Sequence, residues 1–580
     1  MLKPILIIIS FICLMCSNAS FGQGTTDQVF PDGVWGTYTQ NVEVNLDGIN
    51  RTDYPLIKGV SLIINWKNLE PESGQFEFDR IIGERLKSFV RDDFYCYIVV
   101  WVSSACKKNG SDVRWTHSPP WLFEKGVPLV ETKKSSSYPY YLDDDYKFYY
   151  YRMIDSLGEY LCNLPPELQK RVLFVQSAEG STGDEGWYKS DPVDPQYEIT
   201  HEQWTQFRIA AWERYKSALT RNGKQEFYLL INPSLKQREQ YEWVLKNSHK
   251  VFGIKEGSFS HGFHTSFAKP RLADFIQLRN EIEARGLTFF SRGEMNEWQR
   301  NWIGLNPAQG LYWSAIYATH NGLSMWNLQY EAAEGETYAD AINFFNKYAA
   351  EIKPQEAKGA FCALRRGLDA ADAETFPESI YGKADQKNAQ RYLKIVEAFS
   401  EYGATAGDIE AVTGGGMASR RRQKPNDVGW EILAGNWQRH LTQIDPEETS
   451  VAWWQVDKSI YGRFARGFDP DNGKDSLLFD LDDHFFGSRF LNGTQAVVVE
   501  VTFRDSDPGS WKLVYDATDG TMKTAMEITN TGSGGWKIKK VTLDDAYLGN
   551  RGQRGADFIL VNTGGTNCRF HMIAVDKTGQ

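Results

Sequence analysis

Short apolar runs rich in β-branched and aromatic residues alternate with longer amphipathic segments along the first half of the chain. The short runs have the length and composition of buried strands, and the longer segments show helical spacing of their apolar residues. Helices are predicted at 146–164, 201–219 and 270–286, and strands at 59–65, 94–102, 127–131, 172–178, 227–232, 252–256, 287–292 and 323–327. Eight strands joined by crossover helices predict an α/β fold, a closed (β/α)8 TIM barrel.

The pattern changes in the second half of the chain. From residue 451 onward, runs such as AVVVEVTF, WKLVYDA and FHMIAV alternate with period two between Gly, Asp and Asn turns. This alternation predicts an antiparallel β-sandwich. The predicted organisation is therefore a signal peptide at 1–22, a barrel at 30–355, a mixed helical connecting region at 356–450 and an accessory β-sandwich at 451–580.

The first residues indicate export. Lys3 precedes an apolar run from Ile5 to Cys16, and small residues lead up to Gly22. The run is too short to span a bilayer, and no later run is long enough, so we expect a signal peptide cut after Gly22 and no transmembrane segment. Lipoprotein anchoring at Cys16 is the alternative; Met15 stands where such signals usually have a small residue.

Charge and cysteine content exclude several functions. The net charge is −11, and loss of Lys3 with the signal makes the mature chain more acidic. Nucleic-acid binding needs clustered cations, so we expect no nucleic-acid partner. The mature chain keeps Cys96, Cys106, Cys162, Cys362 and Cys568; their spacing does not match a zinc site, and one disulfide among them is possible.

Two acids lie at the ends of predicted strands. Glu179 follows strand 172–178 directly, and Glu294 lies just beyond strand 287–292. In a barrel, the C-terminal ends of the strands surround one site, so these carboxyl groups can share a pocket. Retaining glycoside hydrolysis needs two carboxyl groups about 5 Å apart, one to protonate the leaving oxygen and one to attack the anomeric carbon. An inverting enzyme holds the pair farther apart.

Two segments carry a family resemblance. The stretch GVSLIINWKNLEPESGQFEFD (59–79) is similar to the first-strand segment of the clan A glycoside hydrolases, and HSPPWLFEKGVPLV (117–130) resembles the stretch after their second strand. Over residues 50–330 the chain resembles the family 42 β-galactosidases of that clan. The resemblance implies a retaining mechanism with Glu179 as acid/base and Glu294 as nucleophile, and it implies a galactose-containing substrate, such as an agar- or carrageenan-type galactan.

One position departs from the clan pattern. The clan usually places Asn before the acid/base, whereas this chain has Ala178; Gln176 is a candidate for the missing amide. Because of this departure, Glu185 in GDEGW is kept as an alternative acid. Glu256, at the end of strand 252–256, is a further candidate for hydroxyl binding or for tuning the nucleophile.

Aromatic and basic side chains near strand ends complete the predicted sugar site. Sugar rings pack their C–H faces on aromatic rings, while their hydroxyls need donors and acceptors. Arg292, two residues before Glu294, is a candidate either for holding Glu294 ionised or for contacting an acidic sugar substituent. The predicted substrate-binding residues are Trp66, Trp101, Gln176, Glu256, His261, Arg292, Trp298 and Trp326.

No cofactor is predicted, although Asp469, Asp471 and Asp475 raise the alternative of a structural calcium ion in the β-sandwich. Their spacing does not match an EF-hand loop, and an Asp/Asn/Gly turn explains them equally well. The sequence thus predicts an exported retaining glycoside hydrolase acting on a polysaccharide or oligosaccharide. A non-catalytic glycan-binding protein and a polysaccharide lyase remain alternatives, and the oligomeric state is left open.

Overall fold

We analysed a computed structural model of the chain. It describes residues 29–37, 48–109, 112–134, 136–181, 185–248, 252–255, 268–285, 287, 289–295, 306–349, 353–385, 388–405, 434–487 and 495–578.

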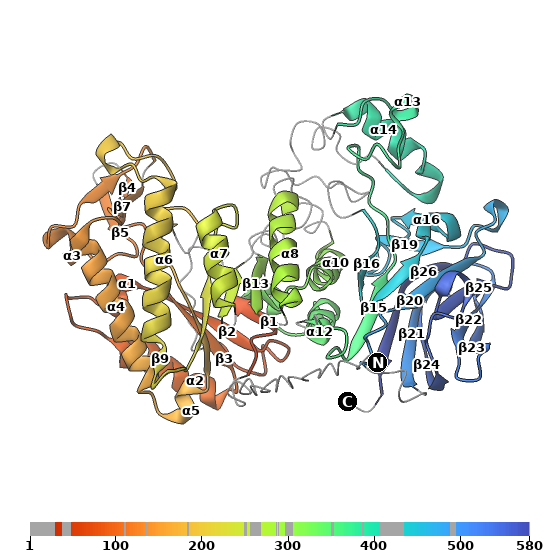
Figure 1. Cartoon of the computed structure of the whole chain (residues 1–580), viewed down its shortest axis with the longest axis horizontal. Coiled ribbons are helices and arrows are strands. Elements are labelled where there is room, and N and C mark those ends of the chain that lie inside the picture. The colour runs from red at the N-terminus through yellow and green to blue at the C-terminus, as the bar shows by residue number, and fades with distance from the viewer. Residues whose placement is uncertain are drawn as a thin grey trace, which may run out of the picture.

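A closed barrel of parallel strands forms the first half of the chain (Figure 1). The barrel order is β1-β14-β13-β12-β11-β8-β3-β2, and pairing of Gly33 with Met325 and of Gly36 with Val60 joins β1 to β14 and β2. The prediction of a (β/α)8 barrel is confirmed. Its strands are β1 (Gly33–Thr37), β2 (Gly59–Asn65), β3 (Tyr95–Trp101), β8 (Val172–Gln176), β11 (Tyr228–Ile231), β12 (Phe252–Lys255), β13 (Phe290–Met295) and β14 (Met325–Gln329).

One predicted barrel strand is wrong, and one barrel strand was missed. The run at 127–131 contributes β6 (Leu129–Glu131) to a small antiparallel sheet with β4 (Cys106–Asn109), β5 (Asp112–Trp115) and β7 (Ser136–Pro139). The first barrel strand is instead β1, whose sequence GVWGT is short and holds two glycines. Both changes precede β8, so β8 and β13 remain the fourth and seventh barrel strands.

Helices cover the outside of the barrel (Figure 1). The α6 helix begins with a capping box between Thr200 and Gln203, which fixes its start at His201. The three predicted helices correspond to α4, α6 and α8 and are confirmed. The helices of the barrel half are α1 (Trp66–Leu69), α2 (Glu84–Arg91), α3 (Trp121–Glu124), α4 (Asp144–Cys162), α5 (Pro166–Gln169), α6 (His201–Ala218), α7 (Arg238–Asn247), α8 (Ala268–Ala284), α10 (Pro307–His320), α11 (Tyr330–Ala333) and α12 (Ala339–Tyr348).

The barrel interior is packed with aromatic and apolar side chains, not open as a pore. Trp35, Tyr97, Phe174, Phe290 and Met325 form one buried cluster, within which the rings of Tyr97 and Phe174 stack at 4.6 Å. Closer to the C-terminal ends of the strands the inward side chains become polar. The packed lower layers therefore support a polar layer at the end where barrel enzymes carry their active groups.

Antiparallel sheets form the C-terminal part. One sheet contains β15 (Gly359–Ala363), β16 (Trp437–Arg439), β18 (Val451–Trp454), β19 (Phe464–Gly467), β21 (Gln495–Arg504), β24 (Trp536–Ala546) and β26 (Arg569–Lys577). The other has the order β17 (Leu441–Ile444), β20 (Ser476–Leu481), β25 (Phe558–Asn562), β22 (Ser510–Asp516) and β23 (Met522–Thr529). Both sheets contribute to one hydrophobic cluster, so they pack face to face. Because β15, β16 and β17 belong to them, the sheets begin well before the predicted boundary at 451.

The barrel and these sheets share a core. The α10 helix is buried from Gln309 to Thr319 on all its sides, and Trp313 packs at 5.8 Å on Trp437 and at 5.1 Å on His571. In Figure 1, α10 and α12 lie between the barrel strands and the sheets. The short helices α13 (Glu378–Tyr381) and α14 (Ala389–Glu397) lie to one side, and α16 (Pro446–Thr449) precedes β18. The described junction at α10 is thus interior.

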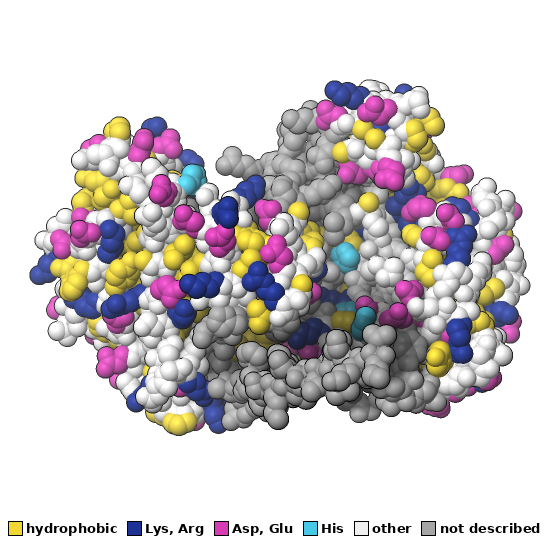
Figure 2. Space-filling model, viewed as in Figure 1, with side chains coloured by type: hydrophobic (Ala, Val, Ile, Leu, Met, Phe, Trp, Pro, Cys, Tyr) yellow, Lys and Arg dark blue, Asp and Glu magenta, His cyan; other side chains and the backbone are white. Residues whose placement is uncertain are grey.

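Acidic and basic side chains are interspersed over the face shown in Figure 2. Cys96, Cys106, Cys162, Cys362 and Cys568 are all free, so the disulfide considered from sequence does not form among them. Among the described residues, no helix combines the length and apolarity needed to cross a bilayer. The segment 1–22, including Cys16, lies outside the described residues.

Candidate active site

The carboxylate of Glu294 is held between two cations at the C-terminal end of the barrel. Lys255, the last residue of β12, places Nζ 2.9 Å from Oε1, and Arg292 places Nη2 3.4 Å from Oε2. The Glu294 side chain is 17% exposed, so it keeps access to solvent. Two cations at this distance favour the ionised form of a carboxyl group.

Arg292 is fixed by bonds that cross the barrel interior. Its Nη1 donates to Gln176 Oε1 at 3.1 Å, its Nη2 to the Tyr97 hydroxyl at 2.8 Å and its Nε to Asn327 Oδ1 at 2.7 Å. Gln176 is on β8 and Tyr97 on β3, neither of which pairs with β13, so these contacts span the lumen. The guanidinium, 3% exposed, therefore has its donors directed by four side chains including Glu294.

Tyr97 remains a neutral hydrogen-bonding group in this cluster. Burial raises the pKa of its hydroxyl, and the charge of Arg292 only partly opposes that shift. The guanidinium also lies over the Tyr97 ring, with Cζ 5.0 Å from the ring centroid. Among the described residues, the polar layer around Glu294 thus combines its carboxylate with the cations Lys255 and Arg292, and neutral amides and a phenol hold the arginine in place.

The Glu179 side chain points away from the barrel interior, toward α6. Ala178 lies in the interior cluster, and the next residue, Glu179, turns outward to α6. There Arg208 Nε contacts Glu179 Oε2 at 3.2 Å, and Trp212 Nε1 donates to Oε1 at 3.1 Å. Glu179 is 2% exposed and Arg208 is fully buried. Both oxygens of Glu179 are therefore engaged with the helix behind β8, away from the Arg292 cluster.

Arg208 continues this buried network to the next strand. Its Nη1 donates to Gln240 Oε1 at 3.0 Å, and its Nη2 donates to the carbonyl of Asn232, just beyond β11. Gln240 in turn donates to Thr205 Oγ1 at 2.9 Å and accepts from the Ser234 amide at 2.8 Å. The Glu179–Arg208 pair thereby ties the loop after β8 to the loop after β11 through α6 and α7.

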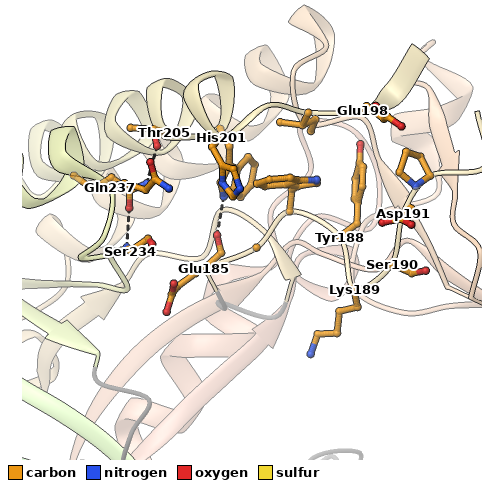
Figure 3. A pocket seen from close by; sticks show the side chains of 16 residues that line it. Glu185, Tyr188, Lys189, Ser190, Asp191, Glu198, His201, Thr205, Ser234 and Gln237 are labelled. Carbon is orange, nitrogen blue, oxygen red and sulfur yellow. Dashed lines mark hydrogen bonds between the residues drawn. The ribbon is translucent and has the colours of Figure 1, made fainter. Parts of the chain in front are cut away.

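Glu185 lies at the surface of a pocket next to this network. Its side chain is half-buried, and its backbone carbonyl accepts from Trp204 Nε1 at 2.7 Å. The pocket has a volume of about 650 Å³. Figure 3 shows Glu185, Ser234 and Gln237 toward one end and Ser190, Asp191 and Glu198 toward the other. Of the two acids considered for proton donation, Glu185 is the one that lines an open pocket.

The predicted aromatic platform is only partly present among the described residues. Trp66 and Trp326 are fully buried in the outer core, where Trp66 donates to Glu70 Oε2 at 2.8 Å and Trp326 packs on Phe345. Neither can stack on a substrate, so their predicted roles are wrong. Trp101, at the end of β3, is half-buried and packs edge-on against His117 at 5.1 Å. Glu256, His261 and Trp298 lie outside the described residues.

Comparison with known proteins gives likeness in structure alone. No protein-family model matches the chain, and no curated protein matches its sequence. The catalytic domain of β-amylase from Paenibacillus polymyxa aligns with 56% of this chain and 99% of its own, at 9% identity and a TM-score of 0.37.

Two further solved structures are similar at the same level. A β-galactosidase from Rahnella sp. R3 aligns over 52% of this chain and 50% of its own, at 14% identity and a TM-score of 0.33. Endo-glycoceramidase II from Rhodococcus sp. aligns over 55% and 78%, at 12% identity and a TM-score of 0.31. The structural neighbours are glycoside hydrolases, but at these scores the argument for function rests on the site itself.

Three of the residues around the acids escaped the sequence analysis. Lys255 and Asn327 are polar residues at the ends of apolar runs, on the same side of their strands as the interior residues, and that alternation was the available signal. Arg208 stands four residues from both Trp204 and Trp212 on α6. A charge inside an aromatic stripe at helical spacing predicts a buried partner, which here is Glu179.

The Asp residues considered for calcium form a turn. Asp469 accepts from Asn472 Nδ2 at 2.8 Å and from the Tyr402 hydroxyl at 3.2 Å. The described part of the chain holds no group of three or more His, Cys, Asp or Glu side chains arranged to bind a metal ion. The local bonds fit the Asp/Asn/Gly turn that was the other interpretation.

Proposed function

We propose that the protein is an exported glycoside hydrolase that cleaves a galactose-containing polysaccharide or oligosaccharide with retention of configuration. The observation that carries the proposal is the Glu294 carboxylate, part-exposed at the C-terminal end of the barrel and flanked by Lys255 and Arg292. A nucleophilic carboxylate must be ionised and must reach the substrate, and this arrangement provides both conditions. Export and the galactose preference rest on the N-terminal sequence and on the family resemblance.

In the proposed reaction Glu294 attacks the anomeric carbon while a second carboxyl group protonates the departing glycosidic oxygen. Water then adds to the anomeric carbon of the glycosyl-enzyme as the second group takes its proton, which releases Glu294. Arg292 and Lys255 hold the Glu294 oxygens so that the carboxylate meets the sugar in one orientation. Their positive charges also stabilise the anionic Glu294 carboxylate, which forms again when the glycosyl-enzyme ester is hydrolysed.

We assign the proton donor to Glu185 in preference to Glu179. Both Glu179 oxygens bond to α6 and its side chain is 2% exposed, so a substrate oxygen has no route to it in this conformation. Glu185 is half-buried in the loop after the same strand, β8. Glu185 was already the alternative acid in the sequence, because Ala178 precedes Glu179 where the clan usually has Asn.

The test is product analysis with purified residues 23–580 and the Glu294→Gln variant on agarose, carrageenans, plant galactans and other polysaccharides. We expect the wild type to release oligosaccharides, with the β or α configuration of the cleaved bond kept in the first product seen by NMR. Glu294→Gln should release none. Inverted product, or full activity of Glu294→Gln, would refute the mechanism.

A second assay separates the two candidate acids. A substrate whose leaving group is 2,4-dinitrophenol needs no proton from the enzyme, whereas a sugar hydroxyl does. We expect Glu185→Gln to slow polysaccharide cleavage by about 10²-fold or more while dinitrophenyl glycoside turnover changes far less. If Glu179→Gln shows that split and Glu185→Gln does not, the proton donor is Glu179.

The engagement of Glu179 also favours a second candidate function. A barrel in which Glu179 is engaged by α6, and which has an aromatic pocket beside it, could serve as a glycan-binding protein without turnover. Wild-type binding of a polysaccharide with no cleavage of any member of the panel would establish that function and exclude the hydrolase.

A further inference from the structure

We infer that Lys255 determines which of the two chemical steps limits turnover. The inference rests on the proposed function, because it takes Glu294 as the nucleophile of a retaining hydrolase. It assigns the Lys255 ammonium group a catalytic effect on each step: it slows attack by Glu294 and speeds release of the sugar from Glu294. The covalent glycosyl-enzyme is therefore kept from accumulating.

Of the two cations beside Glu294, Lys255 makes the closer contact. Lys255 Nζ lies 2.9 Å from Glu294 Oε1, whereas Arg292 Nη2 lies 3.4 Å from Glu294 Oε2. The Lys255 side chain is 8% exposed, so water and salt screen its charge only weakly. Pairing of Lys255 with Arg292 fixes the parallel register of β12 and β13. The ammonium is thus held beside the reacting carboxylate, and it changes the energy of each state in which the charge of that carboxylate differs.

Arg292 is less free to respond to the charge of Glu294. Its Nε donates to Asn327 at 2.7 Å, and its Nη1 donates to Gln176 at 3.1 Å. Both bonds are shorter than its 3.4 Å contact with Glu294. Neutral partners in the barrel therefore hold the guanidinium whether or not Glu294 is charged, whereas the ammonium of Lys255 ends a flexible four-carbon stem. We assign orientation of the carboxylate to Arg292 and the larger effect of charge to Lys255.

The charge on Glu294 changes in opposite directions in the two steps. In the first step a Glu294 oxygen bonds to the anomeric carbon, the bond from that carbon to the glycosidic oxygen breaks, and the departing oxygen takes the proton of the acid. The carboxylate becomes a neutral ester. In the second step the oxygen of water bonds to the anomeric carbon and its proton passes to the conjugate base of the acid, while the electron pair of the ester bond returns to Glu294.

The Lys255 ammonium therefore acts on the two barriers with opposite sign. It stabilises the free carboxylate most and the neutral ester least. The oxocarbenium-like transition states lie between these limits, because the negative charge of the carboxylate is partly offset by positive charge on the sugar. The first barrier is measured from the free carboxylate and rises, whereas the second is measured from the ester and falls. The glycosyl-enzyme is consequently short-lived in the wild type.

The test measures the partition between the two steps in purified residues 23–580, with 2,4-dinitrophenyl β-galactoside as the probe. Acid quenching during steady-state turnover, followed by intact mass measurement and peptide mapping, gives the fraction of protein that carries a sugar on Glu294. We expect the ratio of glycosyl-enzyme to free enzyme to rise at least about tenfold in Lys255→Met. The same quench during cleavage of the polysaccharide that the panel identifies should give a change in the same direction.

Methanol provides a second measurement of the same partition. Methanol competes with water for the glycosyl-enzyme, so it speeds release of dinitrophenol only where the second step limits turnover. We expect it to speed release by Lys255→Met and to leave release by the wild type unchanged. A merely structural role for Lys255 would lower activity without producing this response.

Replacements at the same position separate charge from shape. Lys255→Arg keeps a cation and should retain most of the wild-type partition. Lys255→Gln keeps a hydrogen-bond donor without the charge, and it should behave as Lys255→Met does even if the methionine variant fails to fold. Lys347→Met is the matched control, because it removes a cation from a 2.8 Å pair with Asp576, outside the Glu294 site, and should leave the partition unchanged.

Two results would overturn the inference. They are an unchanged ratio of glycosyl-enzyme to free enzyme in both Lys255→Met and Lys255→Gln, and equal acceleration by methanol in the wild type and these variants. Either result, with a wild type that releases its product with retention, would remove this role of Lys255 and leave the retaining hydrolase. Inverted product, or a wild type that cleaves neither the probe nor any member of the panel, would refute the proposed function and the inference with it.

Discussion

Replacing Glu179 separates a structural from a catalytic role for this residue. Glu179→Gln removes the negative charge opposite Arg208, which is fully buried and also donates to Gln240 and to the Asn232 carbonyl. Burial already lowers the pKa of Arg208, and the charge of Glu179 is the largest opposing effect. The variant therefore leaves a cation without its counter-charge in the protein interior.

Breaking one side of a buried ion pair costs about 3–5 kcal/mol. Because the Gln carbonyl can still accept from Trp212 or Arg208, we expect the lower end, about 3 kcal/mol of the free energy of unfolding. The double replacement Glu179→Leu with Arg208→Met removes both charges and should recover most of that loss. A double-mutant cycle then gives the coupling free energy of the pair directly.

The assay is urea unfolding at pH 7, followed by tryptophan fluorescence and circular dichroism. Asp155→Asn is the control, since it breaks an exposed pair with Arg214 on the same α6 helix and should cost less than about 1 kcal/mol. If Glu179→Gln keeps the wild-type stability but loses polysaccharide cleavage, the buried-pair reasoning fails and Glu179 is the acid.

Three further predictions concern His571 at the junction of the barrel and the sheets, Gly180 in the loop after β8, and Arg292. Burial lowers the pKa of His571 from 6.5 to about 3, so the folded protein loses stability as pH falls through 6.5; between pH 7.5 and pH 5 the loss is about 2 kcal/mol. Urea titrations should show a loss about 2 kcal/mol smaller in His571→Asn than in the wild type, because His320, whose pKa burial lowers to about 4, contributes to the loss in both proteins; equal losses in the two proteins would contradict the prediction. Gly180→Ala should slow polysaccharide cleavage, because a Cβ there would lie 2.5 Å from the Gly186 carbonyl and 2.7 Å from Trp204 and would displace the loop that carries Glu185; unchanged cleavage would show that the loop yields. Arg292→Lys should lower kcat/KM by about 10²-fold with near-native thermal stability, since an ammonium cannot replace the directed guanidinium donors; wild-type kinetics would rule out its positioning role.

The hydrophobic pattern predicted the fold correctly where the strands were long and had clear ends. Seven of the barrel strands had enough apolar residues to be recognised in the sequence. The strand β1 was not recognised, because GVWGT is short and contains two glycines. VPLVE has good strand composition, but composition does not distinguish a barrel strand from an antiparallel edge. The start of the C-terminal sheets was missed because β15 pairs with β26, more than 200 residues later.

The candidate site was predicted only in part. The prediction used the position of each residue along its strand, but not the side of the strand on which its side chain points. In β8 and the residues directly after it, the period of two puts Phe174, Gln176 and Ala178 inside, so Glu179 points outward by the same count. The same period puts Arg292 and Glu294 on one side of β13, as the structure shows. The local pattern marks Arg208 and Lys255 as inward polar residues, but the acid that each one meets, Glu179 or Glu294, depends on the closed barrel.

The burial of α10 on every side limits how this chain can be divided. Trp313 and Tyr312 of the barrel half contact Trp437 and His571 of the sheets, with the Tyr312 hydroxyl 3.1 Å from His571 Nε2. A barrel cut at residue 355 would expose that helix face to water, and large exposed apolar patches drive association. The C-terminal sheets are consequently no exchangeable module: grafting this barrel onto another accessory domain would require a new surface for α10, and the two halves are expected to have diversified together.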